Sequence, residues 1–393
     1  MVFTANYAGN HGAGFYAEGG APLLRDCEFF ANTAGSGGAI YVDGGSTPRI
    51  EGCLIHDNVA VGPGGGIAVE GEASPLIAGC TICGNSSGDG GGIYVGAARA
   101  RIEFTIIRDN SSPFGAGASF TSSDEVTMSC VLLTGNQAAV WGGAISSAYT
   151  VLQLERATIV RNVSSGGAIV LMDGSIVVTD CIIEGNEAGS VFSLEGYCQA
   201  GIGYSDVWGN EGAMIAGTPP PGFGVVAFVN ANGDSCDVYG NLLLDPVFMD
   251  PASGDFHLDF PSPCINAGDP SSPADPDGTA ADMGAFPAGA RLFLSARFMG
   301  ATVELSWNDL PGSDHYWIFG AANDAYFLPG AASDFLFRVA VVPGGTTTWS
   351  TVQGVADPGD EWSYLVMAMQ GQGWEMARSH RAGEREFGIP LPP

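Results

Sequence analysis

The feature that most constrains this sequence is an asparagine that recurs about every 26 residues through the first half of the chain. Successive members are separated by 26, 27, 25, 26, 26, 24 and 24 residues. The series comprises Asn32, Asn58, Asn85, Asn110, Asn136, Asn162, Asn186 and Asn210, and Asn6 precedes it by a further 26 residues. A fixed period of this length is typical of a solenoid, in which each repeat is one coil that buries its apolar face against its neighbours.

Each repeat, aligned on its asparagine, contains three short strand-like segments, such as 75–80, 80–85 and 91–95. A bulky apolar residue stands three positions before each asparagine, as Ile82 does, and strand alternation places it inside the coil. We expect the asparagine to occupy a left-handed bend and its amide to bond its counterparts in the neighbouring coils. The sequence therefore predicts an all-β fold, a right-handed parallel β-helix over residues 1–210.

The repeats resemble the pectate-lyase-like superfamily, and in particular the repeats of polymorphic outer membrane proteins. The resemblance rests on Gly-Gly-Ala-Ile-Tyr at 37–41 and Gly-Gly-Gly-Ile-Tyr at 90–94, each followed by a downstream asparagine. It covers roughly residues 1–210 and implies the fold. Because the superfamily holds lyases, hydrolases, adhesins and structural spikes, the resemblance leaves the function open.

Two further regions follow the repeats. The period fails beyond the eighth asparagine, and residues 211–288 read as a closing segment with an acidic loop that covers the last coil. Residues 289–393 contain strand-like segments at the spacing of a β-sandwich. Within them, residues 303–316 resemble the second and third strands of a fibronectin type III domain. That resemblance implies that Trp307 is the core tryptophan and that Tyr364 occupies the tyrosine-corner position.

The charge of the chain excludes several classes of partner. It contains 42 acidic residues against 13 basic ones, all arginine, for a net charge of −29. Nucleic acids and anionic membranes both require a basic patch, so neither is an expected partner. No apolar segment is long enough to cross a bilayer. The chain opens inside the repeat pattern, so we expect a fragment of an extracellular or cell-surface bacterial protein whose targeting signal lies upstream.

Eight of the nine cysteines, all but Cys83, fall into two groups. One group stands five or six residues before a repeat asparagine, and comprises Cys27, Cys53, Cys80, Cys130 and Cys181. A thiol at one repeat position is typical of a small buried filler that stacks from coil to coil. Cys198, Cys236 and Cys264 lie outside this register and are the better disulfide candidates, with the pairing left open.

The outward position of the third strand is the best candidate surface. It carries Tyr16, Tyr41, Ala68 and Tyr94 in successive coils, and two positions after the first three lie Glu18, Asp43 and Glu70. Aromatic faces stack on sugar rings, so we expect the three tyrosines to bind carbohydrate. Clustered carboxylates can bind calcium or hold a proton above its normal pKa, which makes the three acids the catalytic candidates if the protein is an enzyme.

Pectate lyases, by the same resemblance, use acidic clusters on stacked strands with an arginine as the base. Arg25 and Arg49 follow Glu18 and Asp43 by seven and six residues, which is enough to turn a corner onto another face. A second column, two residues before the asparagine, is chemically mixed, and we expect it to be a solvated face. No phosphate loop or hydrolase nucleophile motif is present.

A candidate calcium loop lies at residues 269–282. Asp275, Asp277 and Gly278 imitate the start of such a loop, and Asp269 and Asp282 could supply further oxygens. The segment lacks the glutamate that ends an EF-hand loop, and the alternative is a turn capped by aspartate and proline.

These observations favour a secreted or surface-displayed β-helix stalk that acts in adhesion, in glycan contact or in cell-surface architecture. A polysaccharide or cell-surface glycan is the expected partner, and Ca²⁺ is the expected cofactor if there is one. The first alternative is a polysaccharide lyase or glycoside hydrolase that works on the outer face of the N-terminal coils. The second alternative is a passive spacer.

Overall fold

The computed structural model describes residues 1–275 and 278–287, together with the backbone of eight strands between residues 294 and 383. The described residues contain no helix, and therefore none that could span a membrane. They form two compact units, residues 1–273 with 280–287, and residues 274–279 with 288–393. The predicted three-part division of the chain stays a prediction.

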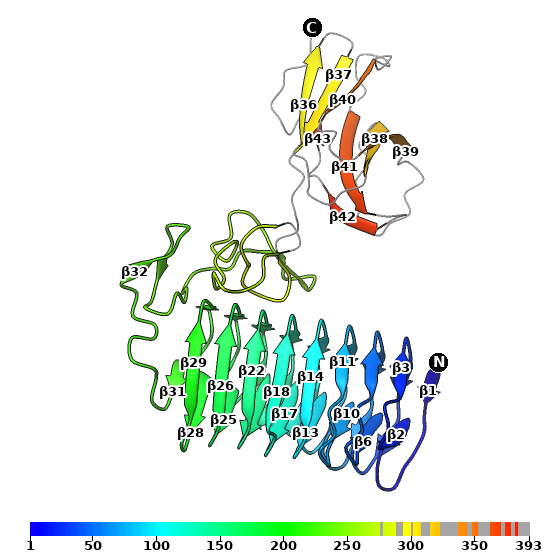
Figure 1. The fold of residues 1–393 in the computed structure, drawn as a ribbon, viewed down its shortest axis with the longest axis vertical. Coiled ribbons are helices and arrows are strands. Elements are labelled where there is room, and N and C mark those ends of the chain that lie inside the picture. Colours follow the sequence, from blue (N-terminus) through cyan, green and yellow to red (C-terminus); the bar gives the residue numbers. More distant parts are fainter. Residues whose placement is uncertain are drawn as a thin grey trace. The chain divides into compact units, whose positions relative to one another are not determined.

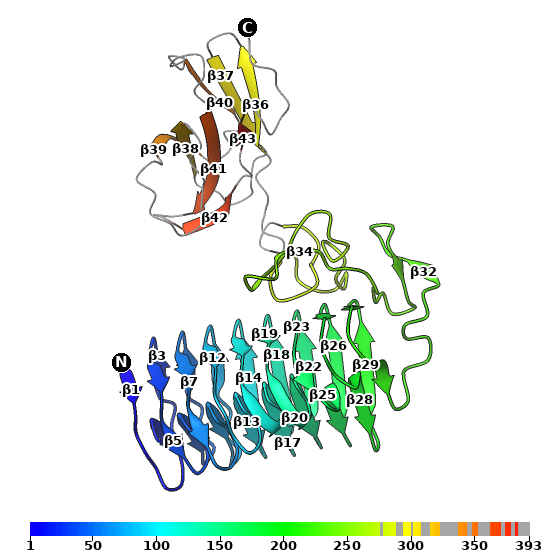
Figure 2. The ribbon, with the colours of Figure 1, turned by 180° about the vertical axis from the view of Figure 1, so that it is seen from behind.

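The first unit is a parallel β-helix in which three sheets run along the coils (Figures 1 and 2). Sheet 1 contains β3 (Leu23–Arg25), β7 (Arg49–Glu51), β11 (Leu76–Ala78), β14 (Arg99–Glu103), β18 (Glu125–Ser129), β22 (Val151–Glu155), β26 (Ser175–Thr179) and β29 (Gln199–Gly203). Sheet 2 contains β1 (Val2–Thr4), β4 (Glu28–Phe30), β8 (Leu54–His56), β12 (Thr81–Cys83), β15 (Ile106–Arg108), β19 (Leu132–Thr134), β23 (Thr158–Val160), β27 (Ile182–Glu184) and β30 (Asp206–Trp208). Sheet 3 contains β2 (Phe15–Glu18), β6 (Ile40–Asp43), β10 (Ile67–Val69), β13 (Ile93–Gly96), β17 (Ala118–Thr121), β21 (Ile145–Ala148), β25 (Gly167–Met172), β28 (Ser190–Glu195) and β31 (Ala213–Ala216).

Each strand pairs in parallel with the equivalent strand one coil away, so the predicted all-β solenoid is confirmed. The structure adds a fourth short strand after the asparagine in some coils, which the sequence did not suggest. These strands are β5 (Thr33–Ala34), β9 (Val59–Ala60), β16 (Ser111–Phe114), β20 (Gln137–Trp141) and β24 (Val163–Ser164).

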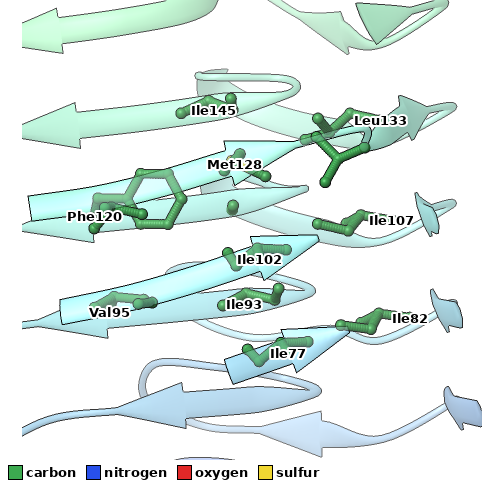
Figure 3. Close-up of a cluster of buried hydrophobic side chains, with 14 of the residues drawn as sticks. Ile77, Ile82, Ile93, Val95, Ile102, Ile107, Phe120, Met128, Leu133 and Ile145 are labelled. Atoms are coloured by element: carbon green, nitrogen blue, oxygen red, sulfur yellow. The ribbon is translucent and has the colours of Figure 1, made fainter. Parts of the chain in front are cut away.

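The core is a set of apolar columns inside the coils, because alternation points one side chain in two inward (Figure 3). Ile82, Ile107 and Leu133 form one such column from sheet 2, and Ile93 and Ile145 belong to another from sheet 3. All five are fully buried. Burial of each such side chain contributes about 1.5–3 kcal/mol, so stacked coils stabilise one another.

The repeat asparagines form a hydrogen-bonded ladder along the edge of this core. Asn110 donates from its backbone nitrogen and from Nδ2 to Oδ1 of Asn136, at 3.1 and 3.0 Å. Asn136 in turn donates from Nδ2 to Oδ1 of Asn162 at 2.9 Å and to the carbonyl of Ile107 at 3.0 Å. The ladder thereby satisfies backbone groups at a corner from which water is excluded.

The left-handed bend at this corner lies one residue earlier than we expected. Asp57, Asp109 and Arg161, each directly before an asparagine, have φ of 54°, 55° and 56°. The asparagine is instead held by its side-chain bonds to the neighbouring coils. A second bend precedes the cysteine column, and Cys130 occupies it with φ of 52°. Val131 therefore takes the buried filler position in that coil, and Cys130 is not part of the column.

The segment after the coils does more than close the last one. Leu242 pairs with the final coil, and its backbone nitrogen donates to the carbonyl of Ser205 at 2.9 Å. This segment contains four strands, β32 (Phe228–Val229), β33 (Ser235–Cys236), β34 (Phe248–Asp250) and β35 (Asp255–Leu258). Residues 245–273 and 280–287, here called the lateral cover, pack along the outer face of sheet 2, where Phe256 contacts Leu132 and Val160. The mixed column expected to be solvated is therefore fully buried at Val160.

Asp180 fastens the lateral cover to the coils. Its carboxylate accepts from the Asp269 nitrogen at 2.6 Å and from the Ser272 hydroxyl at 2.5 Å, and its carbonyl accepts from the Gly284 nitrogen at 2.7 Å. Arg161 adds a hydrogen bond to the carbonyl of Pro251 at 2.6 Å. Burial raises the pKa of Asp180, which is nearly inaccessible to water.

The second unit contains two antiparallel sheets. Their strands are β36 (Leu294–Met299), β37 (Thr302–Trp307) and β40 (Thr348–Val352) in one, and β38 (His315–Ala322), β39 (Phe337–Pro343), β41 (Trp362–Gln370), β42 (Trp374–Arg378) and β43 (Ala382–Gly383) in the other. The side chains of Trp307 and Tyr364 lie outside the described part of the chain. The fibronectin type III domain stays a prediction.

Candidate functional site

Tyr16, Tyr41 and His11 form an aromatic cluster on the outer face of sheet 3, here called the aromatic platform. Tyr16 of β2 and Tyr41 of β6 are register partners, and their rings stack with centroids 5.6 Å apart. His11 comes from the glycine-rich corner before β2, and its ring lies 4.3 Å from that of Tyr41. Tyr16 is 45% exposed, so one stacked ring of the platform faces solvent.

Tyr41 is 3% exposed, so its ring is covered rather than open to solvent, and its role in carbohydrate binding stays a prediction. The glycine-rich corner lies over it: a Cβ placed on Gly37 would come 2.9 Å from the Cβ of Tyr41. The Tyr41 hydroxyl donates to Oε2 of Glu70 at 2.6 Å. Burial, together with this bond, raises the pKa of Tyr41. Tyr41 therefore supports the platform from below.

Tyr94 does not join the platform, because Ala68 occupies the register position between it and Tyr41. It is half-buried, and burial raises its pKa. The three predicted tyrosines thus do not make one continuous exposed surface. Of the three, Tyr16 alone has a ring that is widely open to solvent.

The three candidate carboxylates lie on this face, and each has a partner. Glu18 accepts from the Tyr16 hydroxyl at 3.2 Å, Asp43 accepts from the Gly44 nitrogen at 2.7 Å, and Glu70 accepts from Tyr41. Arg25 and Arg49 lie on sheet 1, where both pair with Glu51, at 2.7 and 2.5 Å. The arginines therefore lie on a different sheet from the candidate acids.

A glycine-rich corner precedes each of the early strands of sheet 3. Sequence reasoning missed two residues of these corners, His11 before β2 and Asp89 before β13. Each directly precedes a glycine with positive φ, Gly12 and Gly90. That shared position was the signal that could have found them, since it marks a further column beside the tyrosines. Burial raises the pKa of the half-buried Asp89, whose Oδ1 has no hydrogen-bond partner.

Two of the four candidate calcium ligands accept hydrogen bonds within the protein. Asp269 accepts from the nitrogen and the hydroxyl of Ser271, and Asp282 accepts from the Asn266 nitrogen at 2.6 Å. Asp275 belongs to the second compact unit, and Asp277 lies outside the described residues. Among the described side chains, no three His, Cys, Asp or Glu form a group that could hold a metal ion. The calcium loop stays a prediction.

The three cysteines proposed for a disulfide are free thiols, so that expectation is wrong. Cys198 donates to the carbonyl of Leu171 at 3.3 Å, and so acts as a further filler beside the coils. Cys264 is fully buried, with its sulfur 3.7 Å from Oδ2 of Asp206. Cys236 is buried in the short β32–β33 pair.

Comparisons with known proteins bear on the fold alone. Residues 3–153 match a family model described as a right handed beta helix region, which with the parallel sheets identifies a right-handed parallel β-helix. No curated protein matches the chain. A solved structure, a Fn3-like protein from Clostridium thermocellum, is similar at 25% identity over 24% of this chain and 91% of that chain, with a TM-score of 0.18. So low a TM-score does not assign the C-terminal fold.

Proposed function

We propose that this protein is a secreted or surface-displayed scaffold that binds glycans at the aromatic platform. The observation that supports this proposal is the half-exposed ring of Tyr16, which is stacked on Tyr41 and bonded to Glu18. A sugar ring offers C–H groups to an aromatic face and hydroxyls to a neighbouring carboxylate. Because the ring is already held in place, binding costs little side-chain entropy.

The charge around the platform favours a neutral glycan. Glu18, Asp43 and Glu70 lie on this face, and the chain as a whole carries a net charge of −29. A polysaccharide of uronic acids would meet like charges at this surface. Neutral hexose or N-acetylhexosamine chains carry no such penalty, and their hydroxyls can donate to the carboxylates.

A lyase or hydrolase at this face would need a proton donor and acceptor within hydrogen-bond reach of the scissile bond. The arginines considered for the role, Arg25 and Arg49, are paired with Glu51 on sheet 1. We therefore prefer binding without cleavage. The passive spacer is the outcome if no glycan binds at all.

Binding to immobilised neutral, amino and acidic polysaccharides tests the proposal. We expect the protein to bind neutral chains and Tyr16→Ala to weaken this binding roughly tenfold, which corresponds to about 1.4 kcal/mol. Tyr7→Ala is the matched control, because Tyr7 is 81% exposed on the same end of the coils but belongs to the fourth-strand corner. Equal binding by Tyr16→Ala and the unchanged protein contradicts the proposal, and so does release of cleaved product.

A further inference from the structure

A second pair of exposed aromatic side chains flanks a groove at a different corner of the β-helix. Tyr149 follows β21 and Tyr197 follows β28, at the turn from sheet 3 to sheet 1. They are 62% and 93% exposed, and both line one open groove together with Asp173, Gly174, Ser175 and Gln199. Most apolar area on these two rings therefore faces water.

The backbone at this corner gives an independent reason to single out Tyr149. The turn needs a left-handed residue in each coil, and Asp173 and Gly196 fill that position in the next two coils with φ of 47° and 78°. Tyr149 adopts φ of 52° there. A bulky residue in this region costs about 1–2 kcal/mol, and burial of the exposed ring does not repay that cost.

One coil lies between the two that carry the tyrosines. Its corner residue is Asp173, followed by Gly174, and a coil spacing of about 4.8 Å places the two tyrosine-bearing coils about 10 Å apart. A ring that stacks on both sides needs about 3.5–4.0 Å from each aromatic face. The oxygen Oδ1 of Asp173 accepts from the Tyr197 nitrogen at 2.8 Å and so fixes the turn that carries Tyr197.

We propose that this groove is a saccharide subsite that holds a pyranose unit of a neutral glycan between Tyr149 and Tyr197. Asp173, Ser175 and Gln199 line the groove and offer the hydrogen-bonding groups that sugar hydroxyls require. A protein partner would be expected on a continuous apolar patch, whereas these two rings are separated by polar residues. Tyr149 lies five coils from Tyr16, so this subsite does not rest on the aromatic platform.

The test measures calorimetric binding of neutral hexasaccharides of glucose, xylose, mannose and N-acetylglucosamine to the full chain. Tyr197→Ser and Tyr149→Asn are the variants, since serine keeps the exposed turn and asparagine tolerates the left-handed region. We expect each variant to weaken the binding at this subsite about tenfold. Tyr7→Ala, at a residue that is 81% exposed and belongs to neither aromatic site, serves as the control, and Tyr16→Ala removes the platform alone.

The outcomes separate the two proposals. If Tyr197→Ser loses binding and Tyr16→Ala binds as well as the unchanged protein, the result supports the subsite and contradicts the platform. Binding by Tyr197→Ser that equals that of the unchanged protein for every hexasaccharide overturns the subsite. Failure of Tyr16→Ala to bind any of the four probes overturns it as well, because the subsite is intact in that variant.

Discussion

The early and late coils share one core but differ on the outer face of sheet 2. The outward position of its strands is Glu28, Leu54 and Thr81 in the early coils, and Ile106, Leu132, Thr158 and Ile182 in the later ones. The lateral cover packs on the later, more apolar stretch. The same buried columns therefore build every coil, while the exposed columns decide what each part of the surface contacts.

This difference shows where function can be sought. An apolar outer column is stable only when another segment removes it from water, as Phe256 does for Leu132 and Val160. A polar outer column needs no cover and stays accessible. The aromatic platform on sheet 3 and the groove between Tyr149 and Tyr197 are both uncovered surfaces of this kind.

The largest effect on stability should come from the asparagine ladder, which the early and late coils share. Asn136→Ala removes the Oδ1 atom that accepts from the backbone nitrogen and Nδ2 of Asn110. It also removes the Nδ2 atom that donates to Oδ1 of Asn162 and to the carbonyl of Ile107. Each buried group left unpaired costs about 1–3 kcal/mol, so we expect a loss of about 4 kcal/mol or more in the free energy of unfolding by denaturant. Gln137→Ala, at the exposed neighbouring amide, is the control and should cost less than about 0.5 kcal/mol. Equal losses in the two variants would contradict the structural role of the ladder.

A pH-dependent effect on stability should come from Asp206, in the last coil. Burial raises the pKa of Asp206 to about 7, and its Oδ1 accepts from the Leu244 nitrogen at 3.1 Å. The same carboxyl has a pKa of about 3.9 in the unfolded chain. Between about pH 4 and pH 7 the folded chain therefore binds a proton on Asp206 that the unfolded chain has lost. The resulting stability is fully present below pH 4 and is lost as the pH rises through 7.

Asp206→Asn should therefore gain stability relative to the unchanged protein between pH 5 and pH 8, by about 2–3 kcal/mol. Denaturant titrations at the two pH values measure the change. Glu211→Gln, at an exposed acid of the same coil, is the control and should show no such trend. A difference between Asp206→Asn and the unchanged protein that stays constant with pH would show that Asp206 is ionised in the folded state.

A smaller, local effect should follow from release of the lateral cover. Asp180→Ala removes the acceptor for Asp269 and Ser272, and we expect faster amide exchange over residues 266–273 and 280–287, with a loss of about 2 kcal/mol. Asp26→Ala is a close control, because Asp26 occupies the equivalent bend with φ of 51° but is exposed. Both variants carry the same backbone strain. Similar amide exchange over these residues in the two variants would therefore contradict the role of Asp180 in fastening the lateral cover.

The smallest effect on stability should appear in the early coils, at the aromatic platform. Tyr41→Phe removes the hydroxyl that donates to Glu70 at 2.6 Å, and we expect a loss of about 1–2 kcal/mol in thermal or chemical unfolding. Tyr16→Phe, whose hydroxyl bonds the exposed Glu18, should change stability by less than about 0.5 kcal/mol. A larger loss in Tyr16→Phe would reverse the assigned roles of supporting and exposed ring.

The sequence was most informative where the chain repeats. Alternation about Ile82 and its equivalents placed the inward columns correctly, because every coil buries the same position. It was less informative where one segment folds over another. The burial of Tyr41 under the glycine-rich corner, and of Val160 under Phe256, depends on contacts between residues that no local period relates. The apolar residues four positions before the late asparagines were the available sign of the lateral cover.

Hydrogen exchange of the full chain, with and without a saturating neutral glycan identified by the binding assay, tests most directly whether the uncovered surfaces carry the function. We predict added protection in residues 11–18 around Tyr16 and in the turns that carry Tyr149 and Tyr197. The lateral cover and the asparagine ladder should be unchanged. Protection confined to the lateral cover, or no change anywhere in the coils, would contradict this account.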